Sequence, residues 1–391
     1  MKKFFAILMA ALMAVSMFAA CGSSAGNDDV QTEGGVLKIG MTGPLTGGAA
    51  EYGLAVEAGI EIAVEEINAA AEANGGLKLA FQSQDDEADG EKAVSGYNVL
   101  KDWGLQVFIG TVTSGACNAV APEAVADEIF LLTPSASATE VAMAGASTFQ
   151  MCFTDPNQGA SAAEVIDANW TGATIGVIYD SSDDYSSGLY EGFMDKAEAM
   201  GLTVMVETAF TADTKSDLST QVTQCKDAGC DLVFLPIYYT EASQILNAAA
   251  KIGYAPTFFG CDGMDGILGV EGFDTSLAEG LALMTPFDAN AADEATQSFV
   301  AKFKEKMNGL VPNQFAADAY DCVYAVYQAA VAAGLDGSES ASEICAVMVE
   351  QFNAMSFDGL TGKGMTWDEN GMISKIPAAV VITDGIYVPM A

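Results

Sequence analysis

The sequence contains no histidine and no arginine, so all 15 basic residues among its 391 residues are lysines. Without histidine, the chain has no Ser–His–Asp or Cys–His catalytic arrangement, no imidazole proton shuttle and no histidine-ligated metal. Without arginine, it has no guanidinium fork to bind a carboxylate or phosphate through two parallel hydrogen bonds. Any anionic group of a ligand must therefore be held by hydroxyls, backbone N–H groups, helix N-termini or lysine.

Positive charge is also scarce, because 53 acidic residues outnumber the 15 lysines and the formal net charge is −38. Such a surface repels nucleic-acid phosphates and anionic lipid headgroups, so we expect no nucleic-acid partner. Apolar residues make up 51% of the chain and charged residues only 17%, which is typical of a folded protein. At roughly 100–200 residues per domain, the length predicts two or three domains.

The N-terminal segment has the features of an export signal. Two lysines precede an apolar run at 4–17, which is too short to span a bilayer comfortably, and Phe-Ala-Ala then precedes Cys21. This resembles a bacterial lipobox and predicts a lipoprotein signal peptide at 1–20, with lipid on Cys21 and a flexible tether over 21–35. The protein is then expected at the cell membrane, lipid-anchored on its extracytoplasmic face. The alternative is a plain signal peptide cut after Ala20, with an unmodified cysteine.

Seven further cysteines are spread along the chain without the spacing of a metal site. Their number is odd and most stand in apolar sequence, which favours small core residues over a disulfide framework. They are Cys117, Cys152, Cys225, Cys230, Cys261, Cys322 and Cys345. A segment from Asp85 mimics the start of a calcium loop, but Gly96 stands where the bidentate glutamate belongs. We therefore expect no metal and no cofactor.

Short apolar runs alternate with longer amphipathic segments in two similar stretches, which is typical of parallel sheets covered by helices. The predicted strands of the first stretch are 36–41, 77–82, 107–110 and 129–133, with helices at 54–68, 89–103 and 115–127. Those of the second are 174–179, 202–207, 232–236 and 257–260, with helices at 186–201, 216–228 and 241–252. The tail adds helices at 293–308, 315–333 and 340–355, an Asn-Gly turn at 370–371, and strands at 378–383 and 386–388.

The predicted fold class is therefore α/β, with two doubly wound parallel-sheet lobes. Ligands of such sheets bind beyond the carboxyl ends of the strands, so two lobes in one chain predict a shared cleft.

Several segments, in the same order along the chain, resemble branched-chain amino-acid binding proteins. These are the extracytoplasmic solute receptors of ABC importers, and they have the Leu/Ile/Val-binding, type I periplasmic-binding-protein fold. The segments are 38–47, 52–53, 59–68, 110–115, 133–138, 153–159, 179–188, 236–239 and 260–263. The resemblance runs from residue 36 to about residue 388, across the whole predicted globular part.

This resemblance implies three chain crossings between two hinged lobes. The crossings are expected near 153–155, 284–286 and 357–361. The first lobe would comprise 36–153 plus 286–358, and the second 154–285 plus 359–391.

The resemblance also implies a site for the carboxylate and ammonium of an amino acid. Ser114 would hold the carboxylate at a helix N-terminus, and an ordinary helix cap is the alternative. Ser135 would offer a backbone contact to the ammonium and Ser137 a hydroxyl to the carboxylate, with a serine-rich turn as the alternative. Asp262 would pair with the ammonium, and Asp265 is a weaker substitute; the alternative is a solvated aspartate in a turn.

Three tyrosines complete this expected site. The resemblance implies that Tyr185 and Tyr238 face the cleft from the second lobe and Tyr52 from the first. Aromatic faces pack against an apolar ligand side chain, whereas the alternative for all three is core packing.

The predicted function is that of a monomeric, lipid-anchored receptor that delivers a small amino acid, branched-chain by the resemblance, to an ABC permease. No phosphate loop and no nucleophile motif is present, so an enzyme is disfavoured. Two alternatives remain: the same role for an amide, a small carboxylate or an aromatic acid, and a sensor for a membrane receptor. The chain departs from the family at Gln150, where a basic residue is common, and at Thr113, where some relatives have cysteine. Because of these departures, the resemblance does not determine which ligand the site prefers.

Overall fold

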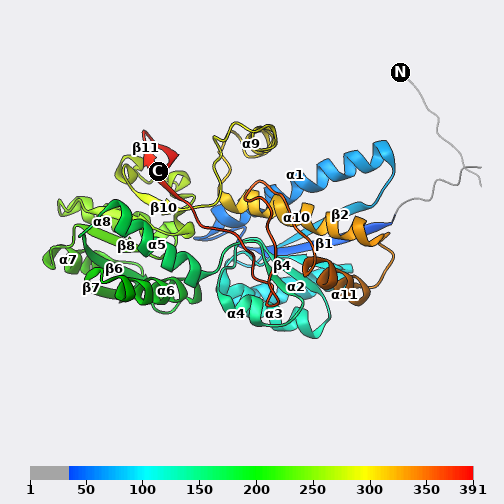
Figure 1. Cartoon of the computed structure of the whole chain (residues 1–391), viewed down its shortest axis with the longest axis horizontal. Coiled ribbons are helices and arrows are strands. Elements are labelled where there is room, and N and C mark those ends of the chain that lie inside the picture. Colours follow the sequence, from blue (N-terminus) through cyan, green and yellow to red (C-terminus); the bar gives the residue numbers. More distant parts are fainter. Residues whose placement is uncertain (1–34, 391) are drawn as a thin grey trace, which may run out of the picture. The chain divides into compact units, whose positions relative to one another are not determined.

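The computed structural model describes residues 35–390, and two separate β-sheets organise this part of the chain. Figure 1 shows two halves side by side: the blue and cyan segments with the orange helices form one, and the green segments form the other. The predicted signal peptide and Cys21 lie outside the described residues. No helix that the structure describes is both long and apolar enough to cross a membrane.

The first sheet has five parallel strands in the order β2-β1-β3-β4-β5. These strands are β1 (Val36–Gly43), β2 (Lys78–Asp85), β3 (Val107–Ile109), β4 (Phe130–Thr133) and β5 (Thr148–Gln150). The helices between them are α1 (Ala50–Asn74), α2 (Gly90–Trp103), α3 (Ser114–Ala126) and α4 (Thr139–Met143). The central strands β3 and β4 are wholly buried because helices cover both faces, which explains why they appear as short continuous apolar runs.

The second sheet has seven strands in the order β12-β11-β10-β9-β8-β6-β7; the β10–β11 and β11–β12 pairs are antiparallel and the other pairs are parallel. They are β6 (Thr174–Asp180), β7 (Thr203–Phe210), β8 (Leu232–Leu235), β9 (Thr257–Gly260), β10 (Ala282–Met284), β11 (Ala379–Thr383) and β12 (Ile386–Pro389). The helices are α5 (Asp155–Asn169), α6 (Asp184–Met200), α7 (Ser219–Asp227) and α8 (Tyr239–Lys251), followed by the 3₁₀ turns η1 (Asp262–Met264), η2 (Ile267–Gly269) and η3 (Thr275–Ala278). The predicted two-lobe α/β fold class is confirmed.

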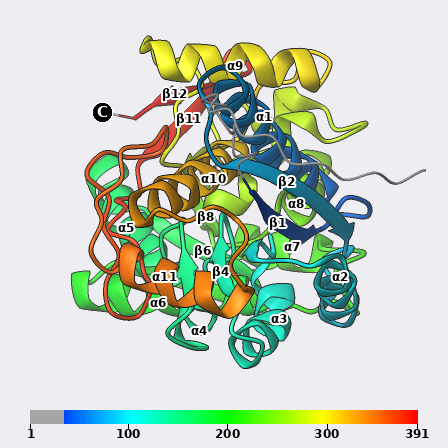
Figure 2. The ribbon, with the colours of Figure 1, turned by 90° about the vertical axis from the view of Figure 1, so that its right-hand side faces the viewer.

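Three later helices belong with the first sheet: α9 (Glu294–Lys306), α10 (Gln314–Ala333) and α11 (Ala341–Phe352). Figures 1 and 2 both show α10 alongside α1. The two backbones approach so closely that a Cβ atom on Gly59 would lie 2.2 Å from the carbonyl oxygen of Ala316. Only glycine fits at this crossing point.

Helix α5 was not predicted from the sequence, although it packs extensively against α6. Glycine and alanine make up half of its buried residues. Gly159 lies against the α6 backbone, where an added Cβ would meet the Leu189 carbonyl oxygen at 2.4 Å. Because close packing of small residues replaces the usual stripe of large apolar side chains, the helical hydrophobic period is weak.

The chain crosses between the halves after β5, after β10 and before β11. The last crossing lies later than expected, because Trp367 donates from Nε1 to the Gln150 carbonyl oxygen at 2.8 Å and the Gln150 N–H donates to the Gly371 carbonyl at 2.9 Å. Residues 359–374, which the resemblance assigned to the second lobe, therefore include segments held against the edge of the first sheet. The expected turn at 370–371 is present, since Trp367 and Ile373 form an antiparallel bridge across it.

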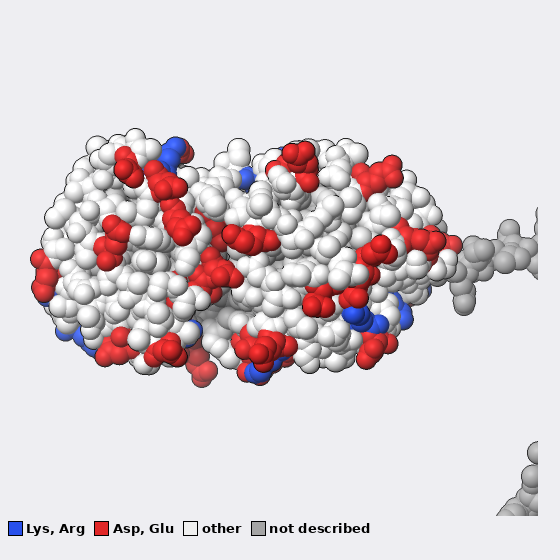
Figure 3. Space-filling model, turned by 90° about the horizontal axis from the view of Figure 1, so that it is seen from below, with Lys and Arg blue, Asp and Glu red and all other residues white. Residues whose placement is uncertain are grey.

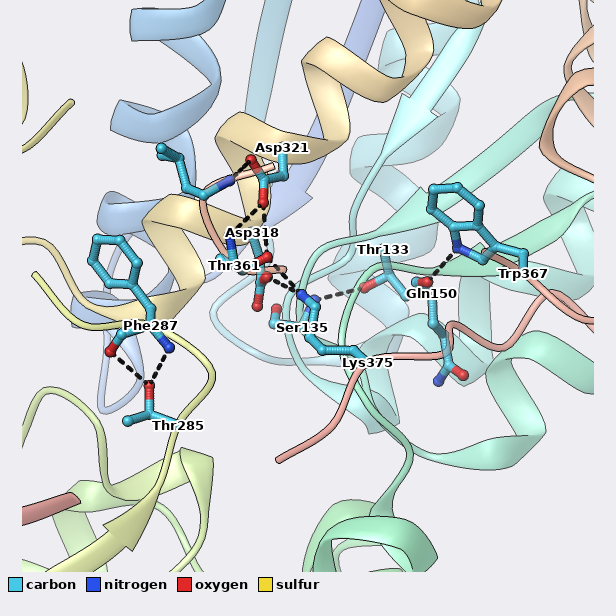
Figure 4. A network of polar contacts seen from close by, with 11 residues as sticks. Thr133, Ser135, Gln150, Thr285, Phe287, Asp318, Asp321, Thr361, Trp367 and Lys375 are labelled. Atoms are coloured by element: carbon cyan, nitrogen blue, oxygen red, sulfur yellow. Dashed lines mark hydrogen bonds and ion pairs between the residues drawn. The ribbon is translucent and has the colours of Figure 1, made fainter. Parts of the chain in front are cut away.

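A buried ion pair marks the start of the third crossing (Figure 4). The Lys375 ammonium contacts the Asp318 carboxylate of α10 and donates to the Thr361 hydroxyl at 2.8 Å. Asp321, one turn later on α10, accepts from the Leu360 and Thr361 N–H groups at 2.8 and 2.9 Å. These contacts attach the last crossing segment to the first half of the molecule.

The seven cysteines after Cys21 are all buried and free of disulfides in the structure. This confirms their interpretation as core residues.

Candidate ligand-binding site

A small enclosed cavity of about 20 Å³ lies between the two halves, beyond the carboxyl ends of strands from both sheets. Such a volume has room for about one water molecule. Its lining residues are Tyr52, Val112, Thr113, Ser114, Ser135, Tyr185, Tyr238, Asp262, Gly263 and Phe315. Six of the seven residues expected at the ligand site therefore converge on one cavity, and Ser137 is not among the lining residues.

The N-terminus of α3 forms one wall of the cavity. Ser114 is the first residue of this helix, is 1% exposed, and its hydroxyl oxygen accepts from the N–H groups of Ser137 and Ala138, both at 3.2 Å. Its hydroxyl hydrogen is not engaged in these two bonds and can be donated to a ligand. No acidic residue stands in the first turn of α3, so this end of the cavity suits an anionic group.

The two serines after β4 have different positions. The Ser135 hydroxyl donates to the Val112 carbonyl at 2.7 Å and is therefore engaged within the protein. A ligand in the cavity would contact Ser135 through its backbone. Ser137 lies behind the residues that line the cavity. Its N–H donates to the Ser114 hydroxyl oxygen, and its own hydroxyl has no hydrogen bond of ordinary geometry. The expected direct contact between Ser137 and a ligand therefore has no counterpart in this cavity.

Asp262 forms the opposite end of the cavity, at the start of η1. The side chain is nearly inaccessible, and Oδ1 accepts from the Tyr185 hydroxyl at 2.7 Å and from the Gly263 N–H at 2.9 Å. Burial raises the pKa of Asp262 to about 6, although its hydrogen bonds oppose the rise. None of the ion pairs in the described part of the chain includes Asp262, and no lysine lines the cavity. A buried carboxylate in this position favours a ligand that brings a cation.

A second buried carboxylate lies close by and was not predicted as a site residue. Asp155 is fully buried at the start of α5, and its N–H donates to the Ser137 carbonyl at 3.0 Å. Neither oxygen of its carboxylate has a hydrogen bond of ordinary geometry. Burial raises the pKa of Asp155 well above its usual value, and the nearby Ser137 hydroxyl opposes the rise. In the sequence, Asp155 precedes a proline at a helix start, which is also the pattern of an ordinary cap.

Aromatic rings fill most of the remaining wall. Tyr185 and Tyr238 stack with centroids 4.8 Å apart, and Tyr52 meets Phe315 edge to face at 5.0 Å. Phe315 was missed because it belongs to α10, some 50 residues beyond the nearest predicted site residue. Only the packing of α10 beside α1 brings this side chain to the cavity.

Hydrogen bonds across the cleft hold the halves in a closed arrangement. The Tyr52 hydroxyl donates to the Gly263 carbonyl and accepts from the Tyr239 N–H at 3.2 Å. Nearer the surface, Thr240 donates to the Gly48 carbonyl at 2.7 Å, and Asn118 donates to Asp184 at 2.8 Å. Figure 3 shows acidic side chains on both sides of the waist between the halves.

The structure describes no group of three or more cysteine, aspartate or glutamate side chains placed to hold a metal ion within residues 35–390. The calcium-like segment is engaged internally, since Asp85 accepts from Leu45, Thr46 and Glu87. The cavity combines a helix N-terminus at one end, a carboxylate at the other and aromatic rings between them. This arrangement complements a small molecule with an anionic end, a cationic group and an apolar body.

Comparison with known proteins gives a consistent result. A family model described as "Periplasmic binding protein" matches residues 36–385. The chain is 27% identical over 345 residues to the leucine-, isoleucine-, valine-, threonine- and alanine-binding protein of Pseudomonas aeruginosa, covering 88% of this chain and 89% of that one. It is 28% identical to the Leu/Ile/Val-binding protein of Escherichia coli K12, with 86% and 87% covered.

Solved structures also match over most of their length. A leucine-binding protein of Thermotoga maritima superposes with a TM-score of 0.80 at 25% identity, covering 91% of this chain and 98% of that one. A solute-binding protein from R. palustris, solved in complex with benzoate, superposes with a TM-score of 0.79 at 20% identity, covering 91% and 96%. Solved proteins with this fold therefore include one described as leucine-binding and one bound to benzoate.

Proposed function

Since the chain belongs to the periplasmic binding protein family and is a non-enzymatic solute-binding protein of the ABC-transporter type, we propose that its ligand is a small α-amino acid, with a branched-chain side chain as the first candidate. The observation that carries this proposal is the buried Asp262 carboxylate, which lines a cavity without any lysine. An α-ammonium would supply the missing cation. The α3 N-terminus and the Ser114 hydroxyl would receive the α-carboxylate.

The ligand side chain would pack against Tyr52, Tyr238 and Phe315. The closed cavity of about 20 Å³ is too small for a branched side chain, so such a ligand would enter an open arrangement and the aromatic rings would settle around it on closure. Branched-chain specificity draws its support from the names of the two bacterial relatives. Alanine, which one of those names includes, would need the least displacement.

The proposed cellular role follows from the family and from the N-terminal sequence. Lipid on Cys21 would anchor the receptor on the extracytoplasmic face, and the closed, loaded form would deliver the amino acid to the membrane subunits of an ABC permease. A cell that lacks its own receptor but retains a cognate permease tests this role. Restored uptake supports delivery, whereas binding without uptake supports the alternative of a sensor.

Isothermal titration of the full-length protein tests the ligand class directly. The panel is leucine, isoleucine, valine, alanine, leucinamide and benzoate, and the variants are Asp262→Asn and, as a matched control, Asp195→Asn on the exposed face of α6. Truncating one partner of a buried charge pair costs about 2–5 kcal/mol, so Asp262→Asn should weaken amino-acid binding at least about thirtyfold. The control should bind like the parent protein.

Binding of benzoate in preference to every amino acid would refute the amino-acid proposal. An unchanged affinity in Asp262→Asn would show that the ligand has no ammonium on this carboxylate. Binding of leucinamide as tight as that of leucine would remove the role proposed for the α3 N-terminus.

A further inference from the structure

A second and larger cavity of about 330 Å³ lies beside the amino-acid site. Its wall comes from both halves of the molecule: the start of α1, residues 265–269, the crossing at 287–290, the segment 307–313 after α9, and the β11–β12 turn at 385–387. The two cavities are separated by the same short segments of chain. Glu51 lines the larger cavity and the adjacent Tyr52 lines the smaller one. Likewise, Asp265 lines the larger cavity and Gly263, two residues earlier, lines the smaller one.

The body of this cavity is apolar. Leu268, Phe287 and Phe303 line it, together with Met307 and Ile386. Ile386 is 54% exposed, so part of this apolar lining faces solvent. A volume above about 300 Å³ with such a lining is typical of small-molecule sites.

The polar groups in the wall are acidic. Asp265 is 3% exposed; its Oδ2 accepts from the Gln314 N–H at 2.8 Å, while its Oδ1 has no hydrogen bond of ordinary geometry. Burial raises the pKa of Asp265 to about 6, and the nearby Tyr387 hydroxyl, which also lines the cavity, opposes the rise. Glu51 and Asp288 also line the cavity, and no lysine does. Burial raises the pKa of Glu51, in agreement with its position in an apolar surrounding. The site therefore combines an apolar body with a buried, half-satisfied carboxylate and a surplus of negative charge.

We propose that this cavity is a second ligand site, which takes a small apolar amine with its ammonium on Asp265 and its hydrocarbon body against Phe287, Leu268 and Ile386. Charge complementarity selects the cation, because three carboxylates and no basic group line the wall. The apolar lining selects a hydrocarbon body over a metal ion or a polyamine. This site goes beyond the proposed amino-acid function and does not depend on which ligand the smaller cavity binds.

Occupancy of this cavity also favours the closed arrangement. Its walls belong to both halves, and Asp265 already joins them through the Gln314 N–H at the start of α10. A ligand that binds the closed form better than the open form shifts the population toward closure. By linkage, the amine and the amino acid then strengthen each other's binding by the same factor.

The test uses 2-phenylethylamine as the cationic probe and 2-phenylethanol as its neutral counterpart, each titrated calorimetrically into the full-length protein. The amine should bind and the alcohol should bind at least about tenfold more weakly, because a hydrogen bond to a charged group contributes about 1.5–3 kcal/mol. Asp265→Asn keeps the oxygen that accepts from Gln314 and should weaken the amine about tenfold to a hundredfold. The exposed Asp195→Asn control should leave amine binding unchanged.

A second variant tests the volume without touching the charge. Ala289→Trp places a large ring at the edge of the cavity, where Ala289 is partly exposed, and it should abolish amine binding while the thermal midpoint stays near that of the parent. This variant keeps the test decisive if Asp265→Asn fails to fold.

Three results would overturn the proposal. The first is the absence of amine binding at millimolar concentration. The second is amine binding that survives both Asp265→Asn and Ala289→Trp. The third is amine binding that is lost in Asp262→Asn but kept in Asp265→Asn, which would place the probe in the smaller cavity.

Discussion

Replacing Tyr52 by phenylalanine should weaken ligand binding without loosening the fold. The substitution removes one hydroxyl that donates to the Gly263 carbonyl and accepts from the Tyr239 N–H, and both partners belong to the other half of the molecule. The ring, which lines the cavity and meets Phe315, is retained. The closed form alone loses these two hydrogen bonds, because in an open form water hydrates the same groups.

The magnitude follows from the two bonds. Each intramolecular hydrogen bond contributes about 0.5–1.5 kcal/mol net, so the closed form of Tyr52→Phe should lose about 1–3 kcal/mol relative to the open form. A ligand that binds by closure then loses about fivefold to 150-fold in affinity. The free energy of unfolding of the ligand-free protein should change by less than about 1 kcal/mol, because an opened cleft leaves both cores intact.

Titration calorimetry and urea unfolding of Tyr52→Phe provide the two readouts. Tyr97→Phe is the matched control, because the Tyr97 hydroxyl is also buried but donates to Asp127 at 3.1 Å within the first half. The control should lose stability and keep its affinity for the ligand. Equal affinities for Tyr52→Phe and the parent protein would refute the reasoning that these cross-cleft bonds hold the closed form.

Four further predictions concern buried charge and packing. Because burial raises the pKa of Asp262 to about 6, amino-acid affinity should fall as pH drops below 6 and the carboxylate is protonated; titrations from pH 8 to pH 5 that show a constant affinity would contradict this. The stability of the ligand-free protein should depend on pH with the opposite sign. Because the folded pKa lies above the unfolded value, the folded state takes up the proton first, so a lower pH stabilises it. Urea midpoints of Asp262→Asn should therefore show a smaller gain in stability between pH 7 and pH 5 than those of the parent. Lys375→Met leaves the Asp318 carboxylate buried without its cation and should lower the free energy of unfolding at pH 7 by about 3–5 kcal/mol, whereas a loss below about 1 kcal/mol would mean that water reaches this pair. Gly59→Ala places a methyl group 2.2 Å from the Ala316 carbonyl oxygen and should cost about 1–3 kcal/mol by separating α1 from α10; unchanged unfolding would show that this crossing is looser.

The fold was largely predictable because its strands are short apolar runs between amphipathic helices. Strand β9 has the predicted bounds, and α2 differs by one residue. The strands β5 and β10 were missed because three residues carry no period of alternation; the equally short β3 was found only as part of the apolar run 107–110. Helix α5 was missed because glycine, alanine and polar residues make up most of its buried face, so large apolar side chains do not recur at helical spacing.

Some of the residues that line the cavity were expected from the sequence, and others were not. The arrangement of parallel strands predicted a cleft beyond their carboxyl ends, whereas individual residues in it, such as Ser114 and Asp262, were expected only because of the family resemblance. Phe315 comes from a helix whose docking on α1 no local pattern reveals. The last crossing was placed too early because the contacts of Trp367 with Gln150 join positions 217 residues apart in the chain.

The charges of the site support the proposed preference for a zwitterion over a simple carboxylate. In a chain without arginine, the α3 N-terminus offers only the partial positive charge of its N–H groups, which is enough to orient an anion but not to neutralise the buried aspartates. At about 4 Å and an effective dielectric constant of about 20, a ligand carboxylate near Asp262 is repelled by about 4 kcal/mol. An α-ammonium on the same molecule would instead be attracted to the Asp262 carboxylate. If the ligand is the proposed amino acid, discrimination between leucine and benzoate rests largely on Asp262, so Asp262→Asn should weaken leucine binding, strengthen benzoate binding and thereby narrow the difference between their affinities.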